Sequence, residues 1–242
     1  MEYTASSTED RKLHEKYHKQ STEGYDVGKD FVQKARDDST VFEGVSGSGD
    51  RVCVIDCLDK PARKRRAQEV LEIAQRELGA VEIPEQDIWQ ERVKEGMEPR
   101  YKAYLYIRGT KCVGLLLVEK ISEAHHVVES LKTTTKRSSS ADTDGKGTAL
   151  SALKARKQAL AQAAAQPLQL STAVVRGMQL GISRIWMSPT HRRQNFASRL
   201  LDTAIADYGC EKEVVAFSQP TEAGARLARR WFGKTYGWCV CM

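Results

Sequence analysis

The feature that most constrains the fold is a strand that leads through a basic turn into an amphipathic helix. Residues 182–187 contain isoleucine and tryptophan and predict a short strand. Residues 192–208 follow and repeat apolar side chains at helical spacing. These side chains are Ala197, Leu200, Leu201, Ala204 and Ile205. The pattern predicts a helix that returns over its own strand.

The turn between this strand and this helix predicts an anion site. The first N–H groups of a helix have no partners within it, and the helix dipole makes that end positive. Arg192 and Arg193 add charge and forked donors that suit phosphate. We therefore expect a pyrophosphate ligand. On these residues alone, an ordinary basic helix start is the alternative.

Segment lengths predict where polar side chains gather. From Ser183 to the end of the strand is roughly 17 Å, and from Arg192 to Asp202 along the helix is roughly 15 Å. An antiparallel return brings Asp202 beside Ser183, and the next strand brings Ser218 and Gln219 to a sheet edge. The four polar side chains are expected to meet at the far end of a cofactor. Taken singly, Asp202 is also compatible with a solvated helix carboxylate, and Ser218 with a turn residue.

Other segments predict an α+β fold with a mainly antiparallel central sheet flanked by helices. One helix is expected to be capped by Asp59, to have Pro61 in its first turn and to end at Gly79. A low-complexity insertion is predicted at about 132–170. The other strands and helices are expected at 11–20, 40–45, 51–58, 104–107, 112–121, 127–131, 214–217, 221–232 and 236–240.

Composition narrows the class of partner. The net charge of +6 and pI near 9.0 suit an acidic partner or a polyanionic cofactor, while direct DNA binding stays open. Apolar runs are too short to span a bilayer, so no membrane partner is expected. Six scattered cysteines predict reduced, buried thiols. The basic run at 63–66 is compatible with a nuclear signal, a DNA patch or a solvated helix start.

Three blocks, in this order, resemble the C-terminal core of the cohesin acetyltransferases. They are Gly-Ile-Ser-Arg-Ile-Trp at 181–186, Arg-Arg-Gln-Asn-Phe-Ala-Ser-Arg at 192–199 and Ala-Phe-Ser-Gln-Pro-Thr-Glu-Ala-Gly at 216–224. Arg-x-x-Asn-x-Ala also resembles the acetyl-CoA pyrophosphate loop of the GNAT superfamily. Asn195 stands where that loop usually has Gly, and Asn is among the residues that best tolerate a left-handed backbone. We therefore expect the loop to keep its shape.

The resemblance implies a GNAT acetyltransferase domain at 40–242 that uses acetyl-CoA. It implies a nuclear protein-lysine N-acetyltransferase that modifies a cohesin SMC subunit to establish sister-chromatid cohesion, with chromatin or replication-fork proteins as further partners. Implied catalytic and substrate-facing residues are Ser183, Asp202, Ser218 and Gln219. Implied cofactor-binding residues are Ile185, Trp186, Met187, Arg192, Arg193, Gln194, Asn195, Phe196 and Ala197.

The chemistry needs a proton acceptor, because a lysine amine has a pKa near 10.4 and making it neutral at pH 7 costs about 4–5 kcal/mol. Gln219 stands where some members of the family that this chain resembles carry Asp and others carry Gln, and Asp202 stands where animal members carry Glu. Since an amide is no base, the resemblance assigns proton removal to Asp202, through water. Two alternatives are a GNAT enzyme for another amine and a catalytically degenerate chromatin-binding module.

The first residues resemble the second half of a C2H2 zinc finger. We predict this remnant at 1–20, followed by a linker at 21–39. His14 and His18 are spaced to share one helix face and form a residual half-site. A structural zinc needs four ligands, so we expect no metal in this chain and zinc as a cofactor is predicted to be absent.

Overall fold

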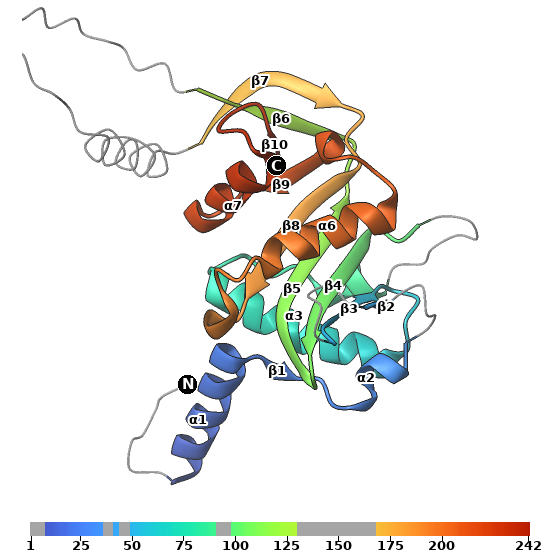
Figure 1. The fold of residues 1–242 in the computed structure, drawn as a ribbon, viewed down its shortest axis with the longest axis vertical. Coiled ribbons are helices and arrows are strands. Elements are labelled where there is room, and N and C mark those ends of the chain that lie inside the picture. The colour runs from blue at the N-terminus through green and yellow to red at the C-terminus, as the bar shows by residue number, and fades with distance from the viewer. Residues whose placement is uncertain (1–7, 36–40, 44–48, 91–97, 130–167) are drawn as a thin grey trace, which may run out of the picture.

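One mixed sheet forms the centre of the protein in a computed structural model that describes residues 8–35, 41–43, 49–90, 98–129 and 168–242 (Figure 1). In these residues ten strands are joined in the order β2-β3-β4-β5-β8-β9-β10-β6-β7, and β1 pairs with β5. Neighbouring strands are antiparallel except β8 with β9 and β9 with β10. The predicted α+β class and mainly antiparallel sheet are confirmed. The strands are β1 (Tyr25–Asp26), β2 (Val41–Glu43), β3 (Arg51–Ile55), β4 (Tyr101–Arg108), β5 (Lys111–Lys120), β6 (Glu123–Val128), β7 (Gln169–Arg176), β8 (Leu180–Met187), β9 (Val215–Ser218) and β10 (Cys239–Cys241).

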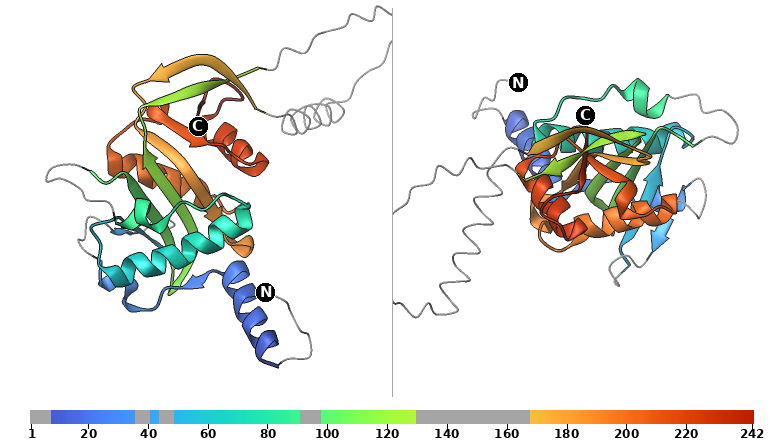
Figure 2. Two further views of the ribbon diagram at one scale, coloured as in Figure 1. Left: turned by 180° about the vertical axis from the view of Figure 1, so that it is seen from behind. Right: turned by 90° about the horizontal axis from the view of Figure 1, so that it is seen from above.

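Helices cover both faces of the sheet, as the two views in Figure 2 show. Because successive side chains of a strand point to opposite faces, β5 feeds two cores. Leu115 and Leu117 pack with α3 on one face, while Leu116 and Val118 pack with α6 and α7 on the other. Each such leucine contributes about 1.5–3 kcal/mol by leaving water. The helical segments are α1 (Thr8–Glu23), α2 (Asp30–Gln33), α3 (Pro61–Leu78), α4 (Glu85–Trp89), η2 (Pro189–His191), α6 (Phe196–Tyr208), η3 (Lys212–Val214) and α7 (Glu222–Phe232).

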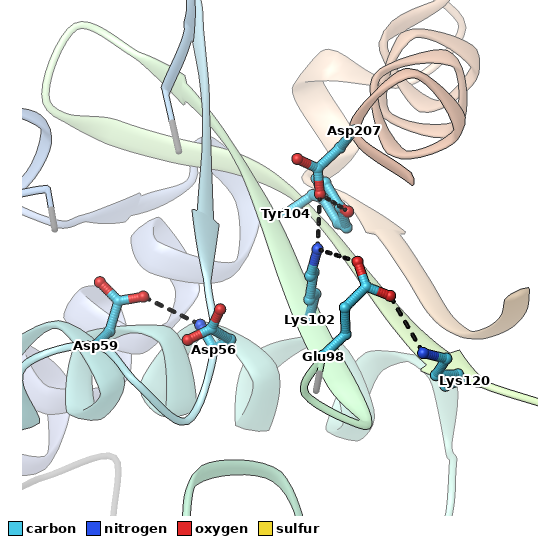
Figure 3. Close-up of polar contacts among 7 residues, drawn as sticks. All are labelled: Asp56, Asp59, Glu98, Lys102, Tyr104, Lys120 and Asp207. Carbon is cyan, nitrogen blue, oxygen red and sulfur yellow. Dashed lines mark hydrogen bonds and ion pairs between the residues drawn. The ribbon is translucent and has the colours of Figure 1, made fainter. Parts of the chain in front are cut away.

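The predicted ends of α3 are half right. Gly79 ends the helix in the left-handed conformation, with φ 59°. The capping prediction for Asp59 is wrong, because Lys60 occupies the N-cap and no side chain caps the helix. The carboxylate of Asp59 instead accepts from the Asp56 N–H at 3.1 Å (Figure 3) and from Arg63 Nε at 3.0 Å. The Asp59 carboxylate therefore forms a buried ion pair with Arg63 and does not cap the backbone N–H groups of α3.

The basic run at 63–66 serves the fold. Arg63 is buried and donates to the Phe31 carbonyl as well as to Asp59. Lys64 donates to the carbonyls of Cys57 and Trp89, both at 3.0 Å. Arg66 donates to the carbonyl of residue 27. The run lies at the start of α3, as the helix-start interpretation predicts, and Arg65 is exposed, but the other three side chains bind backbone carbonyls of packed segments.

Part of the segment predicted as a linker at 21–39 belongs to the packed structure. Tyr25–Asp26 pairs with β5, and the Val27 N–H donates to the Thr110 carbonyl at 2.9 Å. Val27 and Phe31 are each 1% exposed in the core beside α3. The sequence prediction missed this because two isolated apolar side chains give no periodic signal. Helix α1 also continues through the predicted boundary at residue 20 to Glu23.

The predicted insertion falls mostly at 130–167, outside the described residues, and its last residues enter β7. This strand pairs antiparallel with β6 and was not predicted. Among the described cysteines, five are buried, Cys210 is half-buried and all six are free thiols, as predicted. No helix in the described part of the chain is both long and apolar enough to cross a membrane.

Candidate functional site

Strands β8 and β9 part beside the start of α6. They pair in parallel at 180–182 and 215–217, whereas β8 stays paired with β5 as far as Met187. Residues 183–187 of β8 therefore present an edge toward the space that β9 has left. A register shift between Leu117 and Val118 makes Ser183 the extra residue of a β-bulge.

The open edge presents backbone groups of alternate residues. The Ser188 N–H donates to the Val113 carbonyl of β5 at 2.9 Å. Because consecutive residues of a strand direct their N–H and C=O groups to opposite sides, those of Ile185 and Met187 face the opening. The Met187 carbonyl accepts from Arg192 Nε at 3.0 Å. Ile185 thus offers the backbone that a ligand amide needs.

The turn after β8 has the shape expected of an anion loop. Asn195 has φ 67° and ψ 7°, which confirms that asparagine takes the left-handed conformation there, and Arg193 has φ 62°. Backbone of this kind can form a concave set of N–H groups. The Arg199 N–H makes the bond to Asn195 O at 3.2 Å, so the N–H groups of residues 196–198 precede it. The helix begins at Phe196, four residues later than predicted, because these left-handed residues interrupt it.

The two arginines of the loop behave differently. Arg192 Nη2 lies 2.8 Å from Glu77 Oε2, so this side chain ties the loop to α3. Arg193 is exposed beside the start of α6. Trp186 also donates to Glu77, at 2.9 Å, and its side chain lies on the α3 face. Of the predicted cofactor residues, Arg192 and Trp186 therefore support the loop through Glu77.

Aromatic and charged side chains pack beneath the anion loop. Phe196 is buried against Tyr106, with ring centroids 4.8 Å apart, and Arg108 lies 5.0 Å from the Phe196 ring centroid. Arg108 pairs with buried Asp50 at 3.1 Å. Burial, then the positive charges of Arg108 and a nearby lysine, lowers the pKa of His191 from its ordinary value. Burial is the larger cause of this shift, and Arg108 adds positive charge near the helix start while it is itself paired with Asp50.

Gln194 and Ala197 complete the predicted cofactor set. Gln194 Nε2 donates to the Thr190 carbonyl at 3.1 Å, which closes the turn on itself. Ala197 is half-buried against the core of the α6 face. A small side chain there leaves the helix start accessible.

The four residues predicted to meet at the far end of the cofactor are not gathered at one point. Asp202 Oδ1 accepts from Trp231 Nε1 at 2.7 Å and lies 3.8 Å from Lys212 Nζ. These two contacts join α6 to α7 and to η3. Ser183 is buried and donates to Glu119 at 3.3 Å, on the α3 face. The bulge has reversed the alternation of β8, so Ser183 faces away from the helix that carries Asp202.

The other two predicted residues lie where β9 ends. Ser218 pairs with Cys241 of β10 and is half-buried. Gln219 is exposed and has φ 36°, a left-handed value that its turn into α7 imposes. Both lie at the carboxyl end of β9, which is flanked by β8 and β10. Their catalytic roles, and that of Asp202, stay predictions.

The sequence analysis missed two carboxylates, Glu119 and Asp207, that accept hydrogen bonds from neighbouring strands. Glu119 ends the apolar run of β5, and the only available signal was a charge in that run. Asp207 of α6 accepts from Tyr104 at 2.7 Å and from Lys102 at 3.2 Å, and Lys102 and Lys120 both approach Glu98 (Figure 3). This network holds the end of α6 over β4. Burial and Asp207 raise the pKa of Tyr104.

Within the part of the chain that the structure describes, His14 and His18 do not belong to a group of three or more candidate metal ligands. Among the described residues, no group of three or more His, Cys, Asp or Glu side chains could hold a metal ion. The rings of His14 and His18 lie 6.2 Å apart on α1.

Comparison with known proteins finds similar acetyltransferases. The family model described as ESCO1/2 acetyl-transferase matches residues 176–241, which hold β8, the anion loop and α6. N-acetyltransferase eso1 of Schizosaccharomyces pombe is 30% identical over 236 residues, 96% of this chain. N-acetyltransferase ECO1 of Candida glabrata is 26% identical over 251 residues, 96% of this chain and 81% of that protein. These matches support a cohesion-establishment acetyltransferase family for this chain.

Solved structures agree with this family in fold. The xEco2 acetyltransferase domain superposes with a TM-score of 0.55 at 23% identity, covering 80% of this chain and 91% of the domain. The same domain bound to a CoA conjugate gives a TM-score of 0.54 at 22% identity, covering 79% and 91%. Most of this chain therefore shares the fold of the xEco2 acetyltransferase domain. The chain spans 22% of the length of the Schizosaccharomyces pombe relative.

Proposed function

We propose that this chain is an acetyl-CoA-dependent lysine N-acetyltransferase with the GNAT fold, which modifies a cohesin SMC subunit in the nucleus during sister-chromatid cohesion. The observation that carries the proposal is the open edge of β8, which leads to a cationic loop with left-handed backbone at 193 and 195. The relatives named N-acetyltransferase support the reaction, and the domain bound to a CoA conjugate supports the co-substrate. Chromatin or replication-fork proteins are the further partners we propose.

The residues present fit acetyl-CoA. Its diphosphate needs N–H donors and positive charge, and the start of α6 offers residues 196–198 with Arg193 beside them. Its pantetheine amides need backbone partners, and Ile185 faces the opening between β8 and β9. When bound, acetyl-CoA supplies an acetyl group activated as a thioester.

The chain's own residues would bind and orient acetyl-CoA. The N–H groups of residues 196–198 would hold the diphosphate, and Arg192 would keep the loop in place through Glu77. The opening is about four strand steps, roughly 13 Å, from Met187 to Ser183. An arm of that length would end beside the bulge at Ser183, where an acceptor lysine would have to arrive.

Two substitutions of Asn195 test the loop. Glycine keeps the left-handed conformation, whereas valine is β-branched and disfavours it by about 1–2 kcal/mol. We expect Asn195→Val to relax out of that conformation and to bind acetyl-CoA about 5- to 30-fold more weakly in isothermal titration calorimetry. Asn195→Gly should bind like the wild type. Equal affinity of all three proteins would remove the loop from the proposal.

The reaction itself is tested by mass spectrometry. Wild-type protein with acetyl-CoA is expected to acetylate lysines of a recombinant cohesin SMC head, and Asn195→Val to do so more slowly. Acetylation of polyamines or generic histone peptides, without the SMC head, would point to a GNAT enzyme for another amine. Wild-type protein that does not bind acetyl-CoA would instead indicate a chromatin-binding module.

A further inference from the structure

Glu119 lies where β8 and β9 separate. It pairs across the sheet with Gly181 of β8, one residue before the last β8–β9 pair at Ile182 and Phe217. Its Oε2 accepts from Ser183 Oγ at 3.3 Å. The carboxylate therefore stands at the inner end of the opening whose outer end is the anion loop.

The two oxygens of Glu119 have different surroundings. Oε1 accepts both Arg100 bonds, from Nε at 3.0 Å and from Nη2 at 2.6 Å. Oε2 accepts from Ser183, which is 6% exposed and held by the bulge. The Glu119 side chain itself is 22% exposed, so a ligand can reach it. Arg100 is 57% exposed, and exposed ion pairs stabilise proteins little.

The other groups that face Glu119 do not serve as bases at neutral pH. They come from β4, β8 and β10 and are Tyr101, Arg184 and Cys241. Burial, with Glu119 adding to it, raises the pKa of Tyr101 to about 12. Burial also raises the pKa of Cys241 to about 11. Phenol and thiol keep their protons, and Asp202 is engaged with Trp231 on the other face.

We propose that Glu119 Oε2 is the proton acceptor for the substrate amine, with Ser183 as the residue that positions it. The proposal rests on the proposed acetyltransferase function. Glu119 takes one proton from the ammonium group, and the neutral nitrogen attacks the acetyl carbonyl carbon. The new C–N bond forms as the C–S bond breaks, and the departing thiolate takes the second proton from nitrogen. The products are the acetylated amine, CoA thiol and protonated Glu119, which returns its proton to water.

The test compares Glu119→Gln with Arg100→Gln. Removing a general base typically costs 10²- to 10⁴-fold. We expect Glu119→Gln to lower kcat at least about 100-fold and to leave the acetyl-CoA dissociation constant, measured by calorimetry, unchanged. Arg100→Gln removes the ion pair and leaves the base, so its kcat should stay near the wild-type value. Glu119→Asp should recover part of the rate, because it restores a carboxylate one methylene short.

The pH–rate profile separates a base from a structural residue. Wild-type kcat/KM should fall on the acidic side as the base gains a proton, and Glu119→Gln should lack that limb. Wild-type protein without acetyl-CoA binding would overturn the proposed function and this inference together. An active wild type whose Glu119→Gln variant keeps its rate would overturn this inference alone. Equal losses in Glu119→Gln and Arg100→Gln would also overturn it.

Discussion

Glu77 joins three segments, and its replacement by alanine is expected to destabilise the fold and loosen the anion loop together. Oε2 accepts from Trp186 Nε1 at 2.9 Å and from Arg192 Nη2 at 2.8 Å, and Oε1 accepts from Ser21 of α1. Trp186 is 2% exposed, so Glu77→Ala leaves its N–H buried without this partner. That loss costs about 1–3 kcal/mol.

The Arg192 side chain is 52% exposed, so its ion pair adds at most about 1 kcal/mol after solvent screening. We therefore expect Glu77→Ala to lower the free energy of unfolding by about 1–4 kcal/mol. Glu77→Gln is the matched control, because its amide oxygen can still accept from Trp186. It should cost less than about 1 kcal/mol.

Equilibrium unfolding in urea measures both variants, with the midpoint and the slope read together. Calorimetry with acetyl-CoA on the same proteins measures the loop, and Glu77→Ala should bind more weakly than Glu77→Gln. A Glu77→Ala protein within about 0.5 kcal/mol of the wild type would refute the assignment of a buried Trp186 bond. Equal destabilisation by both variants would show that charge, and not hydrogen-bond acceptance, is what matters.

Two further predictions concern Phe196 and His191, which lie beside the start of α6. Phe196→Ala should lower the free energy of unfolding by about 3–5 kcal/mol, because it empties a buried site against Tyr106; urea unfolding measures this, and a loss below about 1 kcal/mol contradicts it. Because the pKa of His191 is lowered in the folded state, the unfolded state binds more protons just below pH 6.5. Stability should therefore be full above that pH and fall as pH drops toward the folded pKa. His191→Gln should flatten the loss in urea titrations at several pH values, and an unchanged pH dependence would assign it to other groups.

Local chemistry in the sequence was enough for the main elements and the loop. The hairpin of β4 and β5 and the end of α3 at Gly79 follow from turn and capping residues. Asn195 adopts the left-handed backbone that its residue type favours. These features depend on a few adjacent residues, so sequence patterns report them directly.

The sequence analysis did not predict β1, α2 or the ion-pair partner of Asp59, and the reason is physical. Strand β1 and helix α2 have too few apolar residues to show a period, and they form because Val27 and Phe31 find a core built by distant segments. Asp59 matched a capping pattern but pairs with Arg63 inside the protein. In each case a partner that is close in space outweighed the local preference.

The arrangement of the candidate site depended on one backbone irregularity. Segment lengths alone placed Asp202 beside Ser183, because they assumed that β8 alternates without interruption. The bulge turns Ser183 to the other face, where it meets Glu119, and Asp202 bonds to Trp231 instead. The amino-acid sequence by itself determined the strand, the loop and the helix. Only the packed sheet decided which carboxylate stands at the end of the opening, since strand register is set by contacts between residues far apart in the chain.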